Sequence, residues 1–179
     1  MFTHRVDEDV SLRLVETRDA ESIFMLTDRH RTHLRTFLPW VDATKTVKDT
    51  REAVRGFREG YAKDRSMTLV ILYQGSIAGV ISFNKLDWVN KIAYIGYWLA
   101  EDYQGKGVMT KSVKVMTDYA FSSLGMNKVD ITAAVENRAS RAVPERLSFT
   151  QEGIIREEEW VNDRFVDHVV YGMLRREWH

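Results

Sequence analysis

The spacing of hydrophobic residues switches along the chain between strand-like and helix-like periods, which predicts an α/β (α+β) fold. Alternating apolar and polar residues over 11–16 predict a first strand, and apolar residues at helical spacing follow it. We expect Thr17 to cap this first helix. Residues 46–49 resemble a capping box, and the helical spacing after them predicts a second helix that ends near Lys63.

An apolar segment interrupted by a proline, residues 34–40, separates these two helices. Proline removes a backbone donor, so we expect a connection here rather than a regular element. Its aromatic side chains have two interpretations: packing in the core, or a lid over an acceptor site.

Three β-rich runs come next and are joined by short turns. Residues 66–73 and 77–84 flank a Gln-Gly-Ser turn at 74–76, which is typical of a β-hairpin. A second turn at 87–91 leads to a third strand at 91–99. The centre of the protein is therefore predicted to be an antiparallel meander.

The last of these strands runs into a glycine-rich turn at 103–107 and then into the start of a helix. Because Gly105 and Gly107 have no Cβ, the backbone can approach a ligand closely there. Free N–H groups in the first helical turn, at the positive end of the helix dipole, favour a phosphate or pyrophosphate. The turn is either such an anion site or only a tight strand-to-helix connection. Gly125 is expected to end the helix.

The C-terminal third continues with a strand over 128–135, a short helix opened by Asn137, and two further strands. Pro144 falls in that helix and is tolerable only within its first turn or so. The strands at 153–160 and 164–174 flank an Asn-Asp pair that suits a hairpin turn.

Length and composition narrow the class of protein. A chain of 179 residues with 44 % hydrophobic content, without a linker or repeat, predicts a single domain over residues 1–179. Lys plus Arg and Asp plus Glu both number 26, so no overall charge recruits nucleic acid or a membrane. No apolar run approaches the ~20 residues of a membrane span, and we expect that the polar N-terminus is not a signal peptide. We expect a cytoplasmic protein without disulfides, thiolate metal sites or a cysteine acyl-enzyme, since cysteine is absent.

The element order and several separately spaced motifs resemble the GNAT superfamily of N-acetyltransferases over essentially the whole chain. Residues 104–109, Gln-Gly-Lys-Gly-Val-Met, resemble its pyrophosphate-binding pattern Q/R-x-x-G-x-G/A, with methionine in the sixth position. Asn137, Ser140 and the run at 146–153 resemble a second signature, in which Ser148 stands where glycine is usual. Within the superfamily, these residues resemble the ribosomal-protein alanine N-acetyltransferases, the Rim group.

The resemblance implies a mixed, mostly antiparallel sheet of about seven strands with about four helices. It also implies direct attack of an amine on the thioester of acetyl-CoA, with no metal. Backbone groups of the glycine-rich turn would hold the pyrophosphate, and the splayed strand end would pair with pantetheine. The implied cofactor-binding residues are Trp98, Leu99, Gln104, Gly105, Lys106, Gly107, Val108, Met109, Thr110 and Asn137.

Two candidate catalytic residues come from the same resemblance. Ser140 is assigned as the acid for the departing coenzyme A thiolate, and Asn137 is either a pantetheine contact or merely an N-cap. Alternation in a strand would put Glu157 and Glu159 on one face. The glutamates at 157–159 have two interpretations. They are a solvated, charged edge strand, or, as the resemblance to the Rim group implies, Glu159 accepts the amine proton or binds the ammonium.

Reference pKa values help to choose the acceptor amine. An α-amino group, with a pKa near ~7.8, is about one-tenth neutral at pH 7. A lysine, with a pKa near ~10.4, has a neutral fraction of only ~10⁻³ to 10⁻⁴. A site with one carboxylate therefore suits an N-terminal amine, by resemblance that of a ribosomal or other protein. A small amine such as a polyamine, an amino-sugar drug or an amino acid remains an alternative, as does a weakly catalytic acyl-CoA-binding module.

The five histidines are scattered and form no metal-binding motif. For His30 and His33 we favour surface or capping roles over acceptor contacts. Exposed aromatic residues near Trp40 and at Trp178, with the resemblance, favour a homo-oligomer, most simply a dimer.

Overall fold

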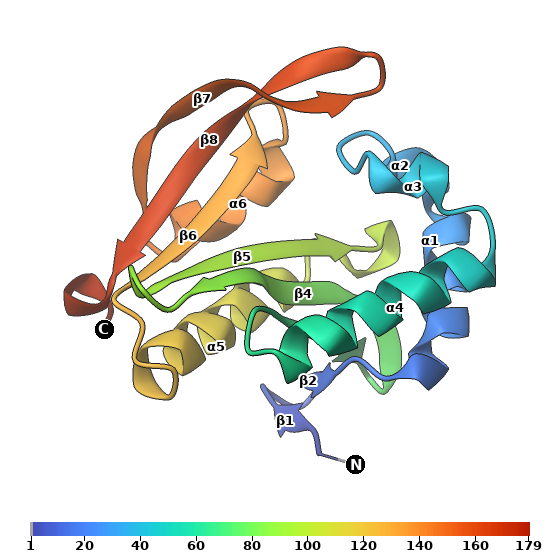
Figure 1. Cartoon of the computed structure of the whole chain (residues 1–179), viewed down its shortest axis with the longest axis horizontal. Helices are drawn as coiled ribbons and strands as arrows, with labels where there is room; N and C mark the ends of the chain where they lie inside the picture. Colours follow the sequence, from blue (N-terminus) through green and yellow to red (C-terminus); the bar gives the residue numbers. More distant parts are fainter. Residues whose placement is uncertain (1) are drawn as a thin grey trace.

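The computed structural model describes residues 2–179, in which one open sheet of eight strands forms the centre (Figure 1). Neighbouring strands are antiparallel except for the parallel pair β5 and β6, in the order β1-β2-β3-β4-β5-β6-β8-β7. This confirms the mixed, mostly antiparallel sheet, with one short strand more than expected. The strands are β1 (His4–Arg5), β2 (Val10–Leu14), β3 (Met67–Tyr73), β4 (Ser76–Asp87), β5 (Ile92–Leu99), β6 (Lys128–Ala134), β7 (Thr150–Val161) and β8 (Arg164–Leu174).

Helices cover both faces of the sheet. Apolar side chains of α1 (Ala20–Arg29) and α4 (Val47–Ala62) pack on one face, around Val70, while α5 (Val108–Ser122) packs on the other, around Ile71. Both β3 residues are fully buried; a strand covered on both faces is apolar throughout rather than alternating. The α-helices are α1 (Ala20–Arg29), α2 (Arg31–Leu34), α3 (Trp40–Ala43), α4 (Val47–Ala62), α5 (Val108–Ser122) and α6 (Arg138–Arg146).

The first helix begins later than predicted, and Thr17 does not cap it. Arg13 donates two hydrogen bonds to the carboxylate of Asp19, at 2.9 and 2.7 Å, and both side chains are buried. The same carboxylate accepts the backbone N–H of Glu16 at 2.7 Å. This ion pair tightens residues 17–19 into a 3₁₀ turn, so α1 starts at Ala20.

The prediction for α4 is confirmed, whereas the proline-interrupted segment before it is more regular than expected. Thr46 and Asp49 form a reciprocal capping box, and Lys63 is the C-cap. Pro39 precedes the one-turn helix α3, where its fixed φ suits a helix start.

Trp178 is packed rather than exposed, so it does not support the predicted dimer. Its ring lies against Phe121 and Phe149, and its Nε1 donates to Asp118 at 2.7 Å. Trp40 is 38 % exposed.

No helix within residues 2–179 has the length and apolar character to cross a membrane.

The parallel strands β5 and β6 separate halfway along their length. Their pairing runs from Ile92 opposite Lys128 to Ile95 opposite Ile131 and ends there. Residues 96–99 remain paired with β4 but have lost their neighbour on the other edge. Backbone groups on that edge are available to a ligand.

Gly79 of β4 packs against the backbone of this open strand end with no room for added volume. A Cβ there would lie 2.2 Å from the carbonyl oxygen of Trp98, whereas one at Gly56 in α4 would meet nothing within 4 Å. We predict that Gly79→Ala lowers the free energy of unfolding by about 1–3 kcal/mol, because the backbone must move. Gly56→Ala should raise it by about 0.5–1 kcal/mol. Urea unfolding measures both, and equal effects of the two substitutions would contradict the packing at Gly79.

Candidate active site

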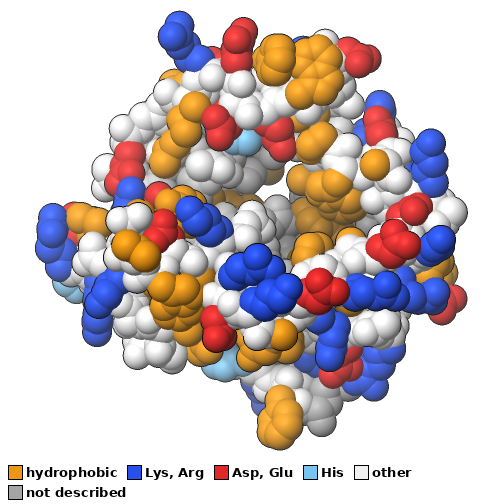
Figure 2. Space-filling view, viewed as in Figure 1, with side chains coloured by type: hydrophobic (Ala, Val, Ile, Leu, Met, Phe, Trp, Pro, Cys, Tyr) orange, Lys and Arg blue, Asp and Glu red, His pale blue; other side chains and the backbone are white. Residues whose placement is uncertain are grey.

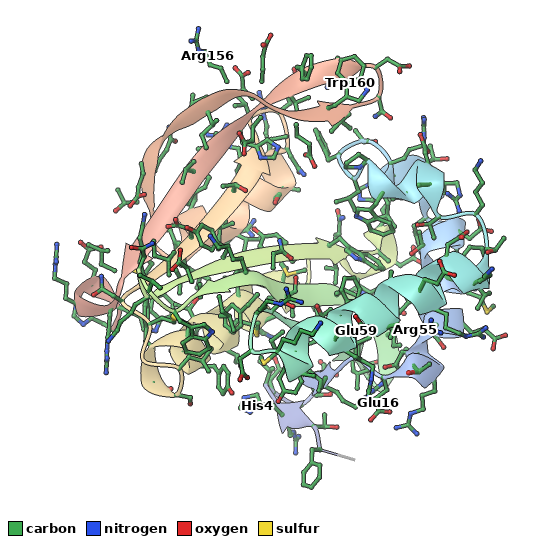
Figure 3. The ribbon with its side chains drawn as sticks, viewed as in Figure 1. His4, Glu16, Arg55, Glu59, Arg156 and Trp160 are labelled. Atoms are coloured by element: carbon green, nitrogen blue, oxygen red, sulfur yellow. The ribbon has the colours of Figure 1, made fainter. Side chains whose placement is uncertain are left out.

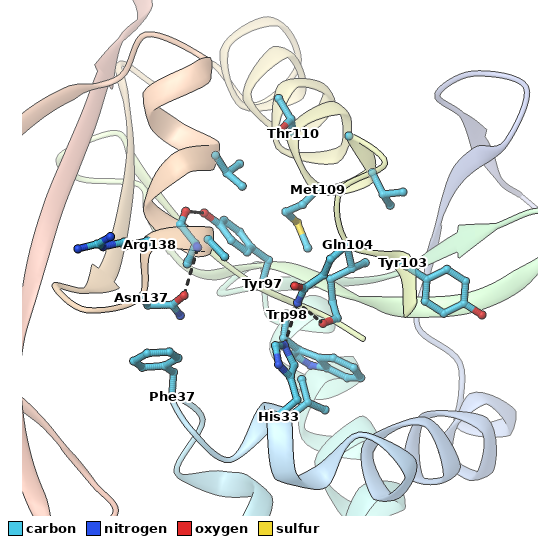
Figure 4. A pocket seen from close by; sticks show the side chains of 18 of the residues that line it. His33, Phe37, Tyr97, Trp98, Tyr103, Gln104, Met109, Thr110, Asn137 and Arg138 are labelled. Carbon is cyan, nitrogen blue, oxygen red and sulfur yellow. Dashed lines mark hydrogen bonds between the residues drawn. The ribbon is translucent and has the colours of Figure 1, made fainter. Parts of the chain in front are cut away.

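Two cavities meet at the open end of β5. The first, the α5 cavity, has a volume of about 730 Å³ and lies between the end of β5 and the starts of α5 and α6 (Figure 4). The second, the α4 cavity, has about 550 Å³ and lies between α4, β4 and the β7–β8 hairpin. Figure 2 shows the surface hollowed beneath that hairpin. Both cavities are lined by Phe37, Leu38, Tyr97, Trp98, Asn137 and Ser140.

The glycine-rich turn has the backbone that the sequence predicts for an anion site. Gly105 and Gly107 have φ of 72° and 73°, in the left-handed region that glycine adopts without strain. Gly107 is the N-cap of α5 and offers no side-chain cap, so the first N–H groups of the 15-residue helix are free for a ligand.

The predicted cofactor-binding residues come together around the α5 cavity, with one exception. The ammonium of Lys106 lies over the rings of Tyr73 and Tyr103, 5.0 and 5.7 Å from their centroids, and this residue does not line the cavity. Its backbone alone belongs to the turn. The residues that do line the cavity are Trp98, Leu99, Gln104, Gly105, Gly107, Val108, Met109, Thr110 and Asn137.

Three cationic side chains at this cavity were missed by sequence reasoning. Lys111, Arg138 and Arg146 line it, and Arg146 reaches Thr110 Oγ1 at 3.5 Å. A hydrogen bond to Asp7 raises the pKa of Lys111, which keeps it charged. Lys111 lies one helical turn after Gly107, a spacing that could have signalled it. Arg138 and Arg146 add positive potential beside the helix N-terminus, whereas the charge of Lys111 is offset by its ion pair with Asp7.

Gln104 and His33 join the glycine-rich turn to α2. The Gln104 side-chain amide lies 2.8 Å from His33 Nε2 and 3.4 Å from the carbonyl oxygen of Leu99. His33 is half-buried and lines the α5 cavity, and its role there stays a prediction.

The two departures from the family pattern have different structural consequences. Met109 is 7 % exposed; it packs in the main core and forms part of the cavity wall. Ser148 has φ of 61°, a left-handed conformation that explains why glycine suits that position.

The sequence predicts that Pro144 is tolerable only within about the first turn of its helix. It is instead the seventh of the nine residues of α6. Proline has no N–H to donate to the carbonyl of Ser140 four residues earlier. The hydroxyl of Tyr97, on β5, donates to that carbonyl at 2.8 Å instead. Burial raises the pKa of Tyr97, so its hydroxyl remains a donor. This bond ties Ser140, which lines both cavities, to the open strand.

Asn137 is an N-cap and also part of the site. Its Oδ1 accepts the backbone N–H of Ser140 at 3.2 Å (Figure 4). The cap holds these two residues together at the junction of the cavities, so the two interpretations of Asn137 are compatible.

Glu159 lines the α4 cavity together with His168, whose Nε2 lies 3.1 Å from Glu159 Oε2. The predicted shared face of Glu157 and Glu159 is wrong. A bulge between Ile155 and Glu159 interrupts the alternation, Glu157 has φ of 52°, and its N–H donates to Asp167. Sequence reasoning missed His168 because it treated the histidines as scattered.

The tip of the β7–β8 hairpin contacts the segment that follows α2. Asn162 donates to the backbone carbonyls of Arg35 and Thr36, at 3.0 and 3.4 Å, and Phe37 packs against Val161 in a small apolar cluster. Figure 3 shows the hairpin reaching across the top of the molecule, with Trp160 near its tip. Of the segment at 34–40, Leu34 is buried, and residues 37–40 line the α4 cavity, so both interpretations stay open.

Comparison with known proteins identifies the family. The acetyltransferase (GNAT) domain family matches residues 9–150. The chain belongs to the GNAT acetyltransferase family.

Relatives of this GNAT chain match it over nearly its full length. A putative ribosomal N-acetyltransferase of Bacillus subtilis, YdaF, is 40 % identical over 179 residues, 99 % of this chain and 98 % of its own. A ribosomal-protein-serine acetyltransferase of Escherichia coli is 30 % identical over 176 residues, 96 % of each chain. The solved structure of RimL, a ribosomal alpha-N-protein acetyltransferase in complex with coenzyme A, has a TM-score of 0.92 at 31 % identity and covers 97 % of this chain and 98 % of that one. The predicted superfamily and the Rim-group resemblance are confirmed, and the GNAT chain is an N-acetyltransferase.

The anion site can be tested through its left-handed glycine. Gly107→Ala should weaken coenzyme A binding about tenfold, because a left-handed alanine costs roughly 1–2 kcal/mol and the turn relaxes away from its binding geometry. Gly75→Ala is the matched control, since Gly75 has φ of 84° in the β3–β4 turn. Titration calorimetry should show unchanged affinity for that control. Equal affinity of both variants would contradict the site.

The bond from Tyr97 to α6 can be tested with a double-mutant cycle. Tyr97→Phe should lower the free energy of unfolding by about 1–3 kcal/mol, because it leaves the Ser140 carbonyl without a donor. Pro144→Ala restores an N–H four residues after Ser140. In that background Tyr97→Phe should cost less than about 0.5 kcal/mol. The same cost in both backgrounds would show that the hydroxyl does not replace the missing N–H.

Proposed function

We propose that this acetyltransferase transfers the acetyl group of acetyl-CoA to the N-terminal α-amino group of a protein, with ribosomal proteins as the first acceptors to test. The observation that carries the proposal is the junction of the cavities: Ser140 meets both of them, with the anion site on one side and Glu159 on the other. The relatives that match the whole chain, named for ribosomal-protein acetylation, support the choice of acceptor.

Acetyl-CoA would occupy the α5 cavity. The backbone from Gln104 to Thr110 would hold the pyrophosphate, and the cations beside it would balance its charge. Pantetheine would enter between β5 and β6, where the free strand edge of Trp98 and Leu99 can pair with its amides and polarise the thioester carbonyl. Asn137 would contact pantetheine beside its cap.

The acceptor amine would enter the α4 cavity and meet the thioester at its junction with the α5 cavity. Glu159 would take one proton from the ammonium, and the free amine would attack the thioester carbon. The C–S bond then breaks, and the leaving thiolate would take a proton from the Ser140 hydroxyl. When the amide forms, the acceptor nitrogen would give its second proton to the Ser140 oxygen, which restores the serine hydroxyl.

The walls of the α4 cavity favour a peptide. Trp98 packs against Trp40 with ring centroids 5.9 Å apart, and polar side chains of β4, including Ser82 and Asn84, line the same cavity. A cavity with one carboxylate and mixed walls suits an α-ammonium followed by a short stretch of chain. An enzyme that acetylates ribosomal proteins would work in the cytoplasm. A homodimer is proposed from the resemblance alone.

The function is tested by coenzyme A release with a panel of ribosomal-protein N-terminal peptides and small amines. We expect turnover with N-terminal peptides and slower turnover with polyamines. Glu159→Gln and Ser140→Ala should each lower kcat by about 10²-fold or more with coenzyme A affinity unchanged, because each removes a proton-transfer group. Tight coenzyme A binding without turnover of any amine would overturn the proposal.

The pH profile separates the two possible roles of Glu159. If it accepts the amine proton, Glu159→Gln should change the pH dependence of kcat/KM. An unchanged profile with a raised KM for the peptide would restrict Glu159 to binding the ammonium.

A further inference from the structure

A second titratable side chain, His168, touches the carboxylate proposed to meet the acceptor amine. His168 is 13 % exposed and Glu159 35 % exposed, and the two are joined by the 3.1 Å contact between Nε2 and Oε2. Within residues 2–179, the side chain of Glu159 makes no other hydrogen bond. The roles proposed above for the reaction leave this histidine without a function.

The register of the hairpin explains why Glu159 is the carboxylate that His168 meets. Counting back from the Asn-Asp turn without a bulge would place Glu157 directly opposite His168. The bulge instead pairs Ile155 with His168 and keeps Glu159 opposite Val166. Glu159 is therefore a diagonal neighbour of His168 on the same face.

The bulge is itself held in place. Glu157 donates its N–H to the Asp167 carboxylate at 2.8 Å, and its side chain is exposed and lines neither cavity. A local kink thus presents one carboxylate, not two, to the cavity. Bulges commonly re-aim a side chain next to an active site.

We propose that His168 is a positioning residue that holds the Glu159 carboxylate in the orientation needed for the acceptor. Nε2–H donates to Oε2, which leaves Oε1 to accept a hydrogen bond from the ammonium. Both the Nε2–H tautomer of neutral histidine and the imidazolium supply this donor. A glutamate has several rotamers, and fixing one of them before the substrate binds removes part of the entropic cost of reaction. The inference rests on the proposed function of Glu159.

The experiment compares three substitutions on a peptide that the wild-type enzyme acetylates. His168→Leu removes the donor, His168→Gln keeps an amide donor at similar reach, and His179→Leu is the matched control on an exposed histidine. We expect kcat/KM to fall about 10- to 100-fold in the leucine variant at 168, as for loss of a hydrogen bond to a charged group. The glutamine variant should stay within about threefold of wild type and the control should be unchanged.

A double-mutant cycle distinguishes positioning from a general packing role. In a Glu159→Gln background, His168→Leu should lower kcat/KM by less than about a further twofold, because the carboxylate that His168 positions is already absent. Full additivity of the two losses would overturn the inference, as would wild-type activity of the leucine variant.

Coenzyme A affinity reports whether each variant is folded. If the His168→Leu variant no longer binds coenzyme A, we replace it in the comparison with His168→Asn. The asparagine amide is one carbon shorter than that of glutamine and cannot reach Glu159. Loss in the asparagine variant with retention in the glutamine variant supports positioning, and equal activity of the two overturns it. A wild-type enzyme inactive with every amine defeats the proposed function first, so the two failures are told apart.

Discussion

The separation of β5 from β6 is the constraint on which the rest of the site depends. Pairing stops at Ile95 and Ile131, and beyond that point β5 is held by β4 alone. A strand edge without a partner has unsatisfied backbone groups, and water or a ligand must satisfy them. Both cavities open at this edge. The glycine-rich turn that follows β5 places the N-terminus of α5 beside it, so backbone edge and helix dipole act on the same ligand.

The elements around this opening share the main core through Met109 and Val143, and polar contacts also join them. Tyr97 bonds to α6, Gln104 to His33 near α2, and Asn162 to the backbone after α2. Polar contacts can break and reform at lower cost than packed apolar surface can separate. The core fixes the sheet and α5, while a few polar bonds hold the segments after α2 and the hairpin tip beside the cavities.

Much of the fold and of the donor side could be predicted from sequence because the signals are local. The capping box at Thr46, the Gln-Gly turn at 74–75 and the two glycines at 105 and 107 are each contained within a few residues. The family resemblance combined these local signals into one predicted fold and identified Asn137 and Ser140 as site residues. Such residues are adjacent in the chain, so their proximity needs no knowledge of the tertiary structure.

The errors and omissions concern contacts between distant segments. Thr17 does not cap α1, because the buried ion pair of Arg13 and Asp19 holds residues 17–19 in a 3₁₀ turn before the helix. Pro144 is tolerated late in α6 because a tyrosine 47 residues earlier replaces its N–H. His168 was missed because its partner is set by the hairpin register and a bulge, which periodicity along one strand does not reveal.

The central claim is that donor and acceptor occupy separate cavities that meet at Ser140. The most direct measurement is a crystal structure with a bisubstrate analogue, coenzyme A joined through its sulfur and an acetyl bridge to the N-terminal nitrogen of a peptide. The account predicts the pyrophosphate on the backbone from Gln104 to Thr110, the sulfur beside Ser140, and the peptide nitrogen directed toward Glu159. A peptide that leaves the junction by another route, with the α4 cavity empty, would contradict it.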